Sequence, residues 1–390
     1  FKENKYMKNE IVLPNYNNCI LNTITSILKY YNVDSNHKSL ESLDKILEKK
    51  YKNVIFLVLD GMGEHILNNI SSKGYFTKNK IDCVTSVYPS TTTAALTTYY
   101  SGKPPYETGW IAWSQYFKEY GRALDMLTHN ESYIREPIKN PTINVFDKIV
   151  NYETIFEQIE KASPNVKTYE LEPSYADRRA KRSIRTENID EIIYTIEDLC
   201  ELPGEKFIFA YSDNPDGILH KYGTTSEEAK EFIQEAEKKI QELYEKLDKD
   251  TILIISADHG HKDIEKAYTL LDYPEIQECL IMPASLESRV VTFWVKENMR
   301  KQFEERFNNV FEKDFWLMAK EEFLANNFLG FGKKHPKIDD FIGNYIALSI
   351  GSSIIRLETF LAEGKPVKKS THCGLTKDEM EVPVIVLSNK

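Results

Sequence analysis

Four apolar runs separated by helical segments give the chain its overall pattern. They are VIFLVL at 54–59, the start of EKFIFAYSDNPDG at 205–217, the start of DTILIISADHGHKD at 250–263, and VPVIVL at 382–387. Such runs are typical of strands buried on both faces of a parallel sheet. Segments such as 225–247 place their apolar residues on one helical face. The alternation predicts an α/β fold with a mostly parallel central sheet sandwiched by helices.

Residues 266–368 follow a different pattern. A strand-like SRVVTFWV is followed by a helical ENMRKQFEERFNNVF and a mixed segment around FLGFGKKHP. We interpret this region as an α+β cap inserted into the core, which would then comprise residues 1–265 and 369–390. The alternative is that the region extends the central sheet.

Length and charge narrow the range of partners. The chain has 390 residues and fits one large domain with an insertion, or two domains. No run approaches the ~20 apolar residues that span a membrane, so no membrane partner is expected. The net charge is -10 and there is no basic stripe, which disfavours long nucleic acid. A small phosphate ester remains a suitable ligand if bound cations supply positive charge.

The cysteines and the first residues indicate the cellular compartment in which the protein is expected. The five cysteines form no CxxC pair, and the first ten residues lack the apolar core of a signal peptide. We therefore expect a reducing, cytoplasmic setting. The sequence leaves the oligomeric state open.

Three aspartates follow the predicted strands. Asp60 ends the first run, Asp216 lies a few residues past the second, and Asp258 ends the third. The carboxyl ends of parallel strands meet at one edge of the sheet, where ligands bind, so these carboxylates should converge. Each one alone could be a turn former or a helix cap. Packed together they would repel one another unless cations lie between them.

Histidines accompany these carboxylates. His220 lies four residues after Asp216, on the same face of a helical turn, and His259 follows Asp258 directly. His372 precedes the last strand and can supply a third ligand beside Asp216 and His220. Carboxylate oxygens and imidazole nitrogens suit zinc. His261 is close in sequence and is a candidate to contact a metal ligand.

A nucleophile must be a hydroxyl or thiol near these metals. The segment after Pro89 offers Ser90, Thr91, Thr92 and Thr93 at the start of a predicted helix. A hydroxyl there is often only an N-cap, but a helix N-terminus also favours a phosphoryl group. Position along the chain does not choose among the four.

Taken together, these motifs resemble the alkaline phosphatase superfamily, and within it the type I phosphodiesterase and nucleotide pyrophosphatase branch. The resemblance runs in the family's order through VIFLVLDGMG, VYPSTTTAALTTYYSGKPPYETG, SDNPDGILHKYG, SADHGH and HCGLTKDEMEVPVIV, between residues 54 and 390. It implies two metal ions, usually zinc, with manganese as an alternative. One ion would be held by Asp60, Thr92, Asp258 and His259, and the other by Asp216, His220 and His372.

The resemblance also implies a nucleophile. Thr92 falls where the family's Pro-Ser-x-Thr pattern places it, so we expect phosphate-ester hydrolysis through a phosphothreonine. The chain departs from the phosphodiesterases at Ala95-Leu96, where they carry Asn-His, and at Trp113, where they carry an asparagine that contacts the phosphoryl group. Cys373 stands in place of the usual glycine. No CxPxR motif is present, which disfavours a sulfatase.

The departures leave the substrate class open. A phosphodiesterase or nucleotide pyrophosphatase is the first hypothesis, a phosphomonoesterase the second, and a non-catalytic zinc-binding module the third. Trp110 and Trp113, after the nucleophile helix, either pack in the core or form an aromatic wall for a flat leaving group, a contact worth ~1–3 kcal/mol. The partner expected is a small phosphate ester or nucleotide-like molecule.

Overall fold

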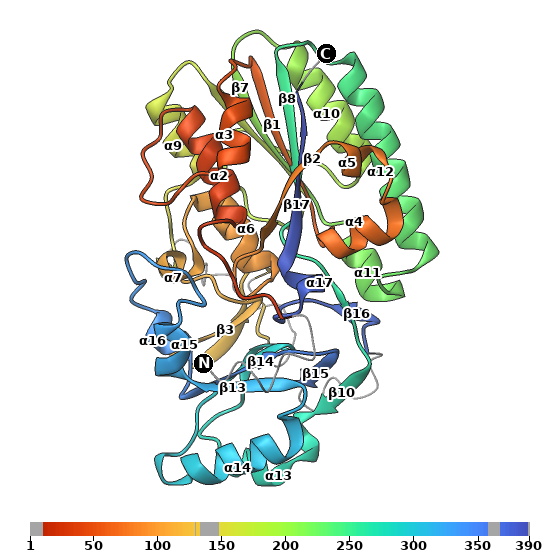
Figure 1. Cartoon of the computed structure of the whole chain (residues 1–390). Helices are drawn as coiled ribbons and strands as arrows, with labels where there is room; N and C mark the ends of the chain where they lie inside the picture. Colours follow the sequence, from red (N-terminus) through yellow and green to blue (C-terminus); the bar gives the residue numbers. More distant parts are fainter. Residues whose placement is uncertain (1–10, 129, 133–147, 358–366, 389–390) are drawn as a thin grey trace.

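The computed structural model describes residues 11–128, 130–132, 148–357 and 367–388. Within these residues the largest element is a seven-stranded sheet, which forms the upper part of the molecule in Figure 1. Its strands, in spatial order, are β2 (Lys80–Thr85), β17 (Glu381–Leu387), β8 (Thr251–Ser256), β1 (Asn53–Leu59), β7 (Lys206–Ser212), β5 (Lys167–Glu172) and β6 (Ser183–Arg185). Every residue of β1, β7 and β8 is buried, as expected for apolar runs covered on both faces.

Strand direction decides which residues meet at the edge of the sheet. β1 runs parallel to β7 and β8, whereas β17 runs antiparallel to β8 and β2. The prediction of a mostly parallel sheet is confirmed, with β17 as the exception. Because β17 is reversed, its start lies at the edge where β1, β7 and β8 end. Residues that precede β17, including His372, therefore reach the same edge as the strand-terminal aspartates.

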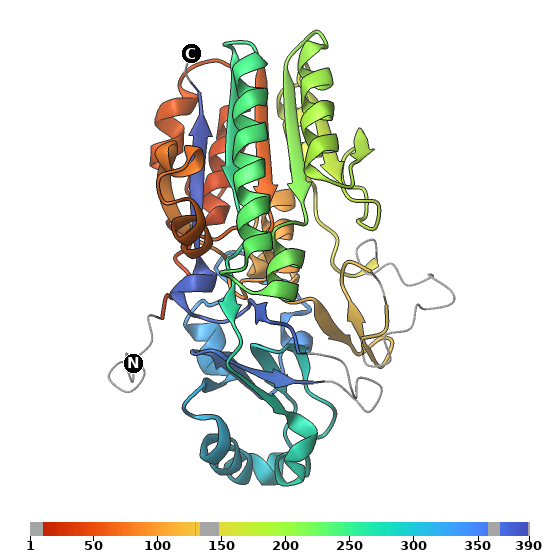
Figure 2. The same ribbon diagram turned by 90° about the vertical axis from the view of Figure 1, so that its right-hand side faces the viewer.

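Helices cover both faces of this sheet (Figures 1 and 2). One layer contains α2 (Ile20–Tyr30), α3 (Glu41–Leu47), α6 (Thr92–Ser101) and α9 (Ile155–Ala162). The other contains α4 (Glu64–Ser71), α5 (Tyr75–Lys78), α10 (Ile189–Glu201), α11 (Asp216–Tyr222) and α12 (Glu227–Lys246). α12 illustrates why these segments form helices that pack on the sheet. Its Ile233, Ile240 and Leu243 recur at helical spacing and are buried. The Ser226 side chain caps the helix by accepting a hydrogen bond from Ala229 N.

A smaller lobe lies below the sheet in Figure 1. It contains a two-stranded pair, β10 (Lys266–Thr269) with β15 (Ser353–Arg356), and an antiparallel sheet in the order β11 (Ser285–Glu287), β12 (Val290–Phe293), β14 (Tyr345–Ser349) and β13 (Phe315–Ala319). Its helices are α13 (Pro274–Gln277), α14 (Arg300–Phe311), α15 (Lys320–Ala325) and α16 (Ile338–Phe341), with 3-10 turns at Leu270–Asp272 and Glu297–Met299. Among the described residues, none of these strands pairs with the central sheet.

The division into a core of 1–265 and 369–390 and a cap of 266–368 stays a proposal, which this separate sheet supports. Residues 1–10 of the core and 358–366 of the cap lie outside the described residues. A short antiparallel pair, β9 (Lys262–Asp263) with β16 (Ser370–Thr371), joins the chain where it enters the cap to the chain where it leaves. Along the described part of the chain, no helix combines the length and apolar character needed to cross a membrane.

The cap also packs on the segment that follows α6. This segment contains α7 (Pro105–Thr108) and the hairpin of β3 (Ser114–Phe117) and β4 (Arg122–Asp125). Phe117 and Phe341 meet edge to face with ring centroids 5.1 Å apart. The cap therefore contributes to the surroundings of the active-site edge, together with α17 (Lys377–Met380), which leads into β17.

Candidate active site

The three strand-terminal aspartates converge at one edge of the sheet. Asp60 directly follows β1, Asp258 lies two residues after β8, and Asp216 begins α11 beyond β7. Backbone hydrogen bonds tie the turns together, since Asp60 N donates to Ser212 O at 3.0 Å and Asp216 N donates to Asp60 O at 2.9 Å. The convergence expected from strand direction is present.

Asp60, Asp258 and His259 form the first of two side-chain clusters. His259 Nε2 lies 3.4 Å from Asp60 Oδ1 and 3.3 Å from Asp258 Oδ2. The amides of Gly61 and His259 donate to Asp258 Oδ1 at 3.0 and 2.9 Å. Asp60 Oδ1 and Asp258 Oδ2 are buried without a hydrogen-bond partner. Two orphaned, inward-facing carboxylate oxygens beside an imidazole nitrogen fit a divalent metal ion.

The electrostatics of this cluster call for a cation. Burial, reinforced by the charges of Asp258 and Asp216, raises the pKa of Asp60 well above its usual value. Burial also raises the pKa of Asp258. Ionised carboxylates this close together repel one another, and a bound metal ion removes that repulsion.

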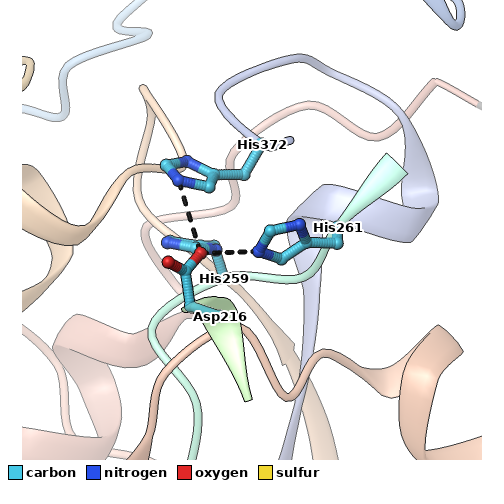
Figure 3. Close-up of side chains that lie close together, drawn as sticks. All are labelled: Asp216, His259, His261 and His372. Atoms are coloured by element: carbon cyan, nitrogen blue, oxygen red, sulfur yellow. Dashed lines mark hydrogen bonds and ion pairs between the residues drawn. The ribbon is translucent and has the colours of Figure 1, made fainter. Parts of the chain in front are cut away.

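The second cluster surrounds Asp216. Figure 3 shows Asp216 with His261 and His372 of this cluster, together with His259 of the first. His261 Nε2 lies 2.6 Å from Asp216 Oδ1, His220 Nε2 lies 3.4 Å away, and His372 Nε2 lies 3.6 Å away. The rings of His259 and His372 stack with centroids 3.8 Å apart, so the two clusters adjoin. Six of the seven predicted metal-site residues therefore lie within this pair of clusters, and the seventh, Thr92, lies beside the first.

Hydrogen bonds orient the imidazoles of the second cluster. His220 Nδ1 lies 2.8 Å from Ser370 O, and His372 Nδ1 lies 3.2 Å from Ser90 O. A carbonyl can only accept, so each Nδ1 carries the proton and each Nε2 presents a lone pair toward Asp216. Burial lowers the pKa of both histidines, which keeps them neutral and suited to bind a metal ion.

The four candidate hydroxyls have different surroundings. Ser90 Oγ donates to Gly374 O at 3.1 Å, Thr91 Oγ1 donates to a carboxylate of the cap, and Thr93 Oγ1 is buried without a partner. Thr92 is the first residue of α6, and its Oγ1 lies 3.2 Å from His259 Nε2 and 3.4 Å from Asp60 Oδ2. Thr92 is thus the hydroxyl of the four that contacts the first cluster.

The sequence profile of the type I phosphodiesterase / nucleotide pyrophosphatase family matches residues 54–327. The chain belongs to this family. Hydrolysis of phosphate-ester or pyrophosphate bonds is the activity of the family, so the resemblance and the enzyme class expected from the motifs are confirmed. No curated protein sequence matches the chain significantly.

Solved structures show the same fold. Murine ectonucleotide pyrophosphatase / phosphodiesterase 5 is 15% identical with a TM-score of 0.63, over 86% of this chain and 87% of that one. Phosphonoacetate hydrolase from Sinorhizobium meliloti 1021 is also 15% identical, with a TM-score of 0.61, over 86% of this chain and 90% of that one. The murine protein has also been solved as an inactive threonine-to-alanine variant in complex with AMP.

Two site residues of this phosphodiesterase family member were undervalued from sequence. His261 is fully buried, makes the shortest contact to Asp216, and lies 3.0 Å from Ser370 Oγ through Nδ1. The His-Gly-His spacing was the signal available for it. Tyr211, the next-to-last residue of β7, donates a short hydrogen bond to Asp60 Oδ2, and nothing in its local sequence indicates that role.

The two tryptophans proposed as an aromatic wall differ in exposure. Trp110 is fully buried, and its Nε1 donates to Val150 O at 2.9 Å, so its side chain offers no surface to a ligand and packs in the core. Trp113 is half-buried beside the nucleophile segment. A cavity of only about 20 Å³, room for about one water molecule, is lined by Tyr211 and by Tyr175, which is 47% exposed.

Proposed function

We propose that this protein is a phosphodiesterase or nucleotide pyrophosphatase that uses two metal ions of the zinc type and Thr92 as its nucleophile. The observation that carries the proposal is the position of Thr92 Oγ1, 3.2 Å from His259 Nε2 and 3.4 Å from Asp60 Oδ2, beside the cluster around Asp216. The donors are carboxylate oxygens and neutral imidazole nitrogens, which fit zinc and also accept manganese.

The proposed assignment of residues follows from the two clusters. Asp60, Thr92, Asp258 and His259 would hold one ion, and Asp216, His220 and His372 the other. His261 would fix the Asp216 carboxylate through the 2.6 Å contact. When bound, the ions would lower the pKa of the Thr92 hydroxyl and neutralise charge on the entering and leaving oxygens.

The residues of the chain then support a two-step transfer. Thr92 gives its hydroxyl proton to water as its Oγ1 attacks phosphorus. The bond to the leaving oxygen breaks, that oxygen takes up a proton from water, and a phosphothreonine forms. Backbone N–H groups at the start of α6 face the phosphoryl oxygens, because the first turn of a helix leaves its amides unpaired. Water then cleaves the phosphothreonine and regenerates the Thr92 hydroxyl.

A small nucleotide-like ester suits the surroundings of the site. Tyr175, which is 47% exposed, and the half-buried Trp113 are the aromatic surfaces on which we propose that a flat leaving group stacks. The AMP complex of the murine structural neighbour supports this class. We also propose a reducing, cytoplasmic setting, which the five free cysteines support.

The test compares Thr92→Ala with a matched control, Thr93→Val, which removes a neighbouring hydroxyl that has no hydrogen-bond partner. Each variant is assayed on the p-nitrophenyl ester of thymidine 5′-monophosphate and on p-nitrophenyl phosphate, with zinc and manganese content measured. We expect Thr92→Ala to lose at least about 10³-fold in kcat and Thr93→Val to stay within about threefold.

Three results would redirect the proposal. Retained turnover in Thr92→Ala would remove the phosphothreonine step. A wild-type preference for p-nitrophenyl phosphate would indicate the phosphomonoesterase instead. Bound metal without turnover of either ester would indicate the non-catalytic metal-binding module.

A further inference from the structure

One carboxylate of the cap reaches into the nucleophile region. Glu287 ends β11, and its Oε1 accepts hydrogen bonds from Thr91 Oγ1 and from Trp113 N, both at 2.7 Å. Its Oε2 accepts from Cys373 Sγ at 2.8 Å. Glu287 thus contacts the residue before Thr92, the residue after His372, and the segment after the nucleophile helix.

Glu287 also lies close to a proposed metal ligand. A carboxylate oxygen of Glu287, Cys373 Sγ and a ring nitrogen of His372 all lie within 4.8 Å of one another. Cys373 holds this contact from a backbone φ of +89°, a left-handed conformation that is uncommon for any residue other than glycine. The negative charge of Glu287 is therefore held at the rim of the metal clusters.

The partners of Glu287 do not neutralise it. They are a hydroxyl, a backbone amide and a thiol, all of which are uncharged donors. The nearby Arg289 is committed elsewhere, because it pairs with both oxygens of Glu379 at 2.6 Å and neither side chain is exposed. Within the described ranges, no lysine or arginine forms an ion pair with Glu287.

We propose that Glu287 sets the charge that the site accepts on the phosphoryl group. A phosphodiester carries one negative charge near neutral pH, whereas a phosphomonoester carries close to two. A fixed carboxylate beside the nucleophile segment repels the second charge and so favours diesters. The inference rests on the proposed function, and it gives Glu287 a specificity role.

A second arrangement, in which Glu287 helps to hold an additional cation, is also chemically reasonable and predicts the opposite change in monoester turnover. Glu287, His372 and Cys373 each offer a metal-ligand atom, so an additional cation held there would attract the second charge of a monoester. Neutralising Glu287 would then weaken monoester turnover. The sign of the change separates the two arrangements.

The experiment uses Glu287→Gln, which keeps an oxygen to accept from Thr91 and Trp113 but removes the charge. The control is Glu304→Gln, a carboxylate on α14 that accepts from Tyr345 in the cap. The ratio of kcat/KM for p-nitrophenyl phosphate to that for p-nitrophenyl thymidine 5′-monophosphate is measured at saturating zinc. We expect Glu287→Gln to raise this ratio about tenfold, mainly through KM, and the control to leave it unchanged.

A second measurement needs no variant. Raising the ionic strength from about 0.05 M to about 0.5 M should raise the same ratio in the wild-type protein, because salt screens the repulsion. The proposal is overturned if the monoester-to-diester ratio of kcat/KM changes neither with salt nor in Glu287→Gln. It is also overturned if that ratio falls in Glu287→Gln. In both cases the hydrolase function stands. If the wild-type protein turns over neither ester, the proposed function is overturned as well. The failure of the proposed function can therefore be told apart from the failure of the Glu287 proposal alone.

Discussion

The buried ion pair of Arg289 and Glu379 connects the cap to the loop that carries His372. Arg289 Nε and Nη2 donate to the two Glu379 oxygens at 2.6 Å each, and neither residue is exposed. Glu379 also accepts from Gly374 N at 2.7 Å and from Thr376 Oγ1 at 2.5 Å. The pair therefore holds the turn that begins directly after His372 and Cys373.

Removing one partner leaves a buried charge without compensation, which typically costs about 3–5 kcal/mol. In Arg289→Met, Glu379 keeps its two other donors, so we expect the lower end, about 3 kcal/mol. In Glu379→Gln, Arg289 keeps the amide oxygen of residue 379 and the carbonyls of Ser353 and Gly351, at 2.9 and 2.7 Å, but no counter-charge. We expect about 4 kcal/mol there. The double variant should cost clearly less than the sum, because neither charge is then stranded.

The assay is equilibrium unfolding in urea, followed by two spectroscopic probes because a chain with several hydrophobic clusters need not unfold in one step. The matched control is Lys118→Met, which breaks an exposed pair with Asp340 and should cost less than about 1 kcal/mol. Zinc affinity, measured by competition with a chelator, should fall in Glu379→Gln because the backbone beside His372 loses its anchor.

Two results would refute this reasoning. A cost for Arg289→Met no larger than that for Lys118→Met would mean that the Glu379 carboxylate is solvated or compensated without its arginine. A cost for the double variant equal to the full sum of the single variants would mean that the two side chains act independently.

Further predictions concern the metal clusters and the tryptophans. Because burial raises the pKa of Asp60 and Asp258 in the folded chain, protonation stabilises the metal-free protein at low pH and this stabilisation is lost as the pH rises through the raised pKa. Chelation should therefore lower the melting temperature more at about pH 8 than at about pH 6, as thermal unfolding with and without chelator would show. Trp110→Ala should cost about 3–5 kcal/mol of stability with little change in KM, whereas Trp113→Ala should mainly raise KM, as steady-state kinetics would show.

Much of the architecture was predictable from local pattern. Uninterrupted apolar runs at residues 54–59 and 252–255 predicted strands buried on both faces, because a covered parallel sheet removes every side chain of such a run from water. The polar residue at the end of each strand then had to lie at a common edge, which is why Asp60 and Asp258 could be placed together without coordinates. The reversed direction of β17 was not predictable, since an apolar run reads the same in either direction.

The chain by itself therefore predicted four of the seven strands of the central sheet, the carboxylate and imidazole groups that follow them, and the set of four hydroxyls after Pro89. The family resemblance pointed to Thr92, but only the tertiary structure shows which hydroxyl lies beside Asp60 and His259, because successive residues of a helix turn by about 100° and each points to a different neighbour. It also decided the roles of His261 and Glu287, whose contacts join positions 45 and 196 residues apart. Local pattern encodes burial and spacing, whereas contacts across such distances arise only when the folded backbone brings the segments together.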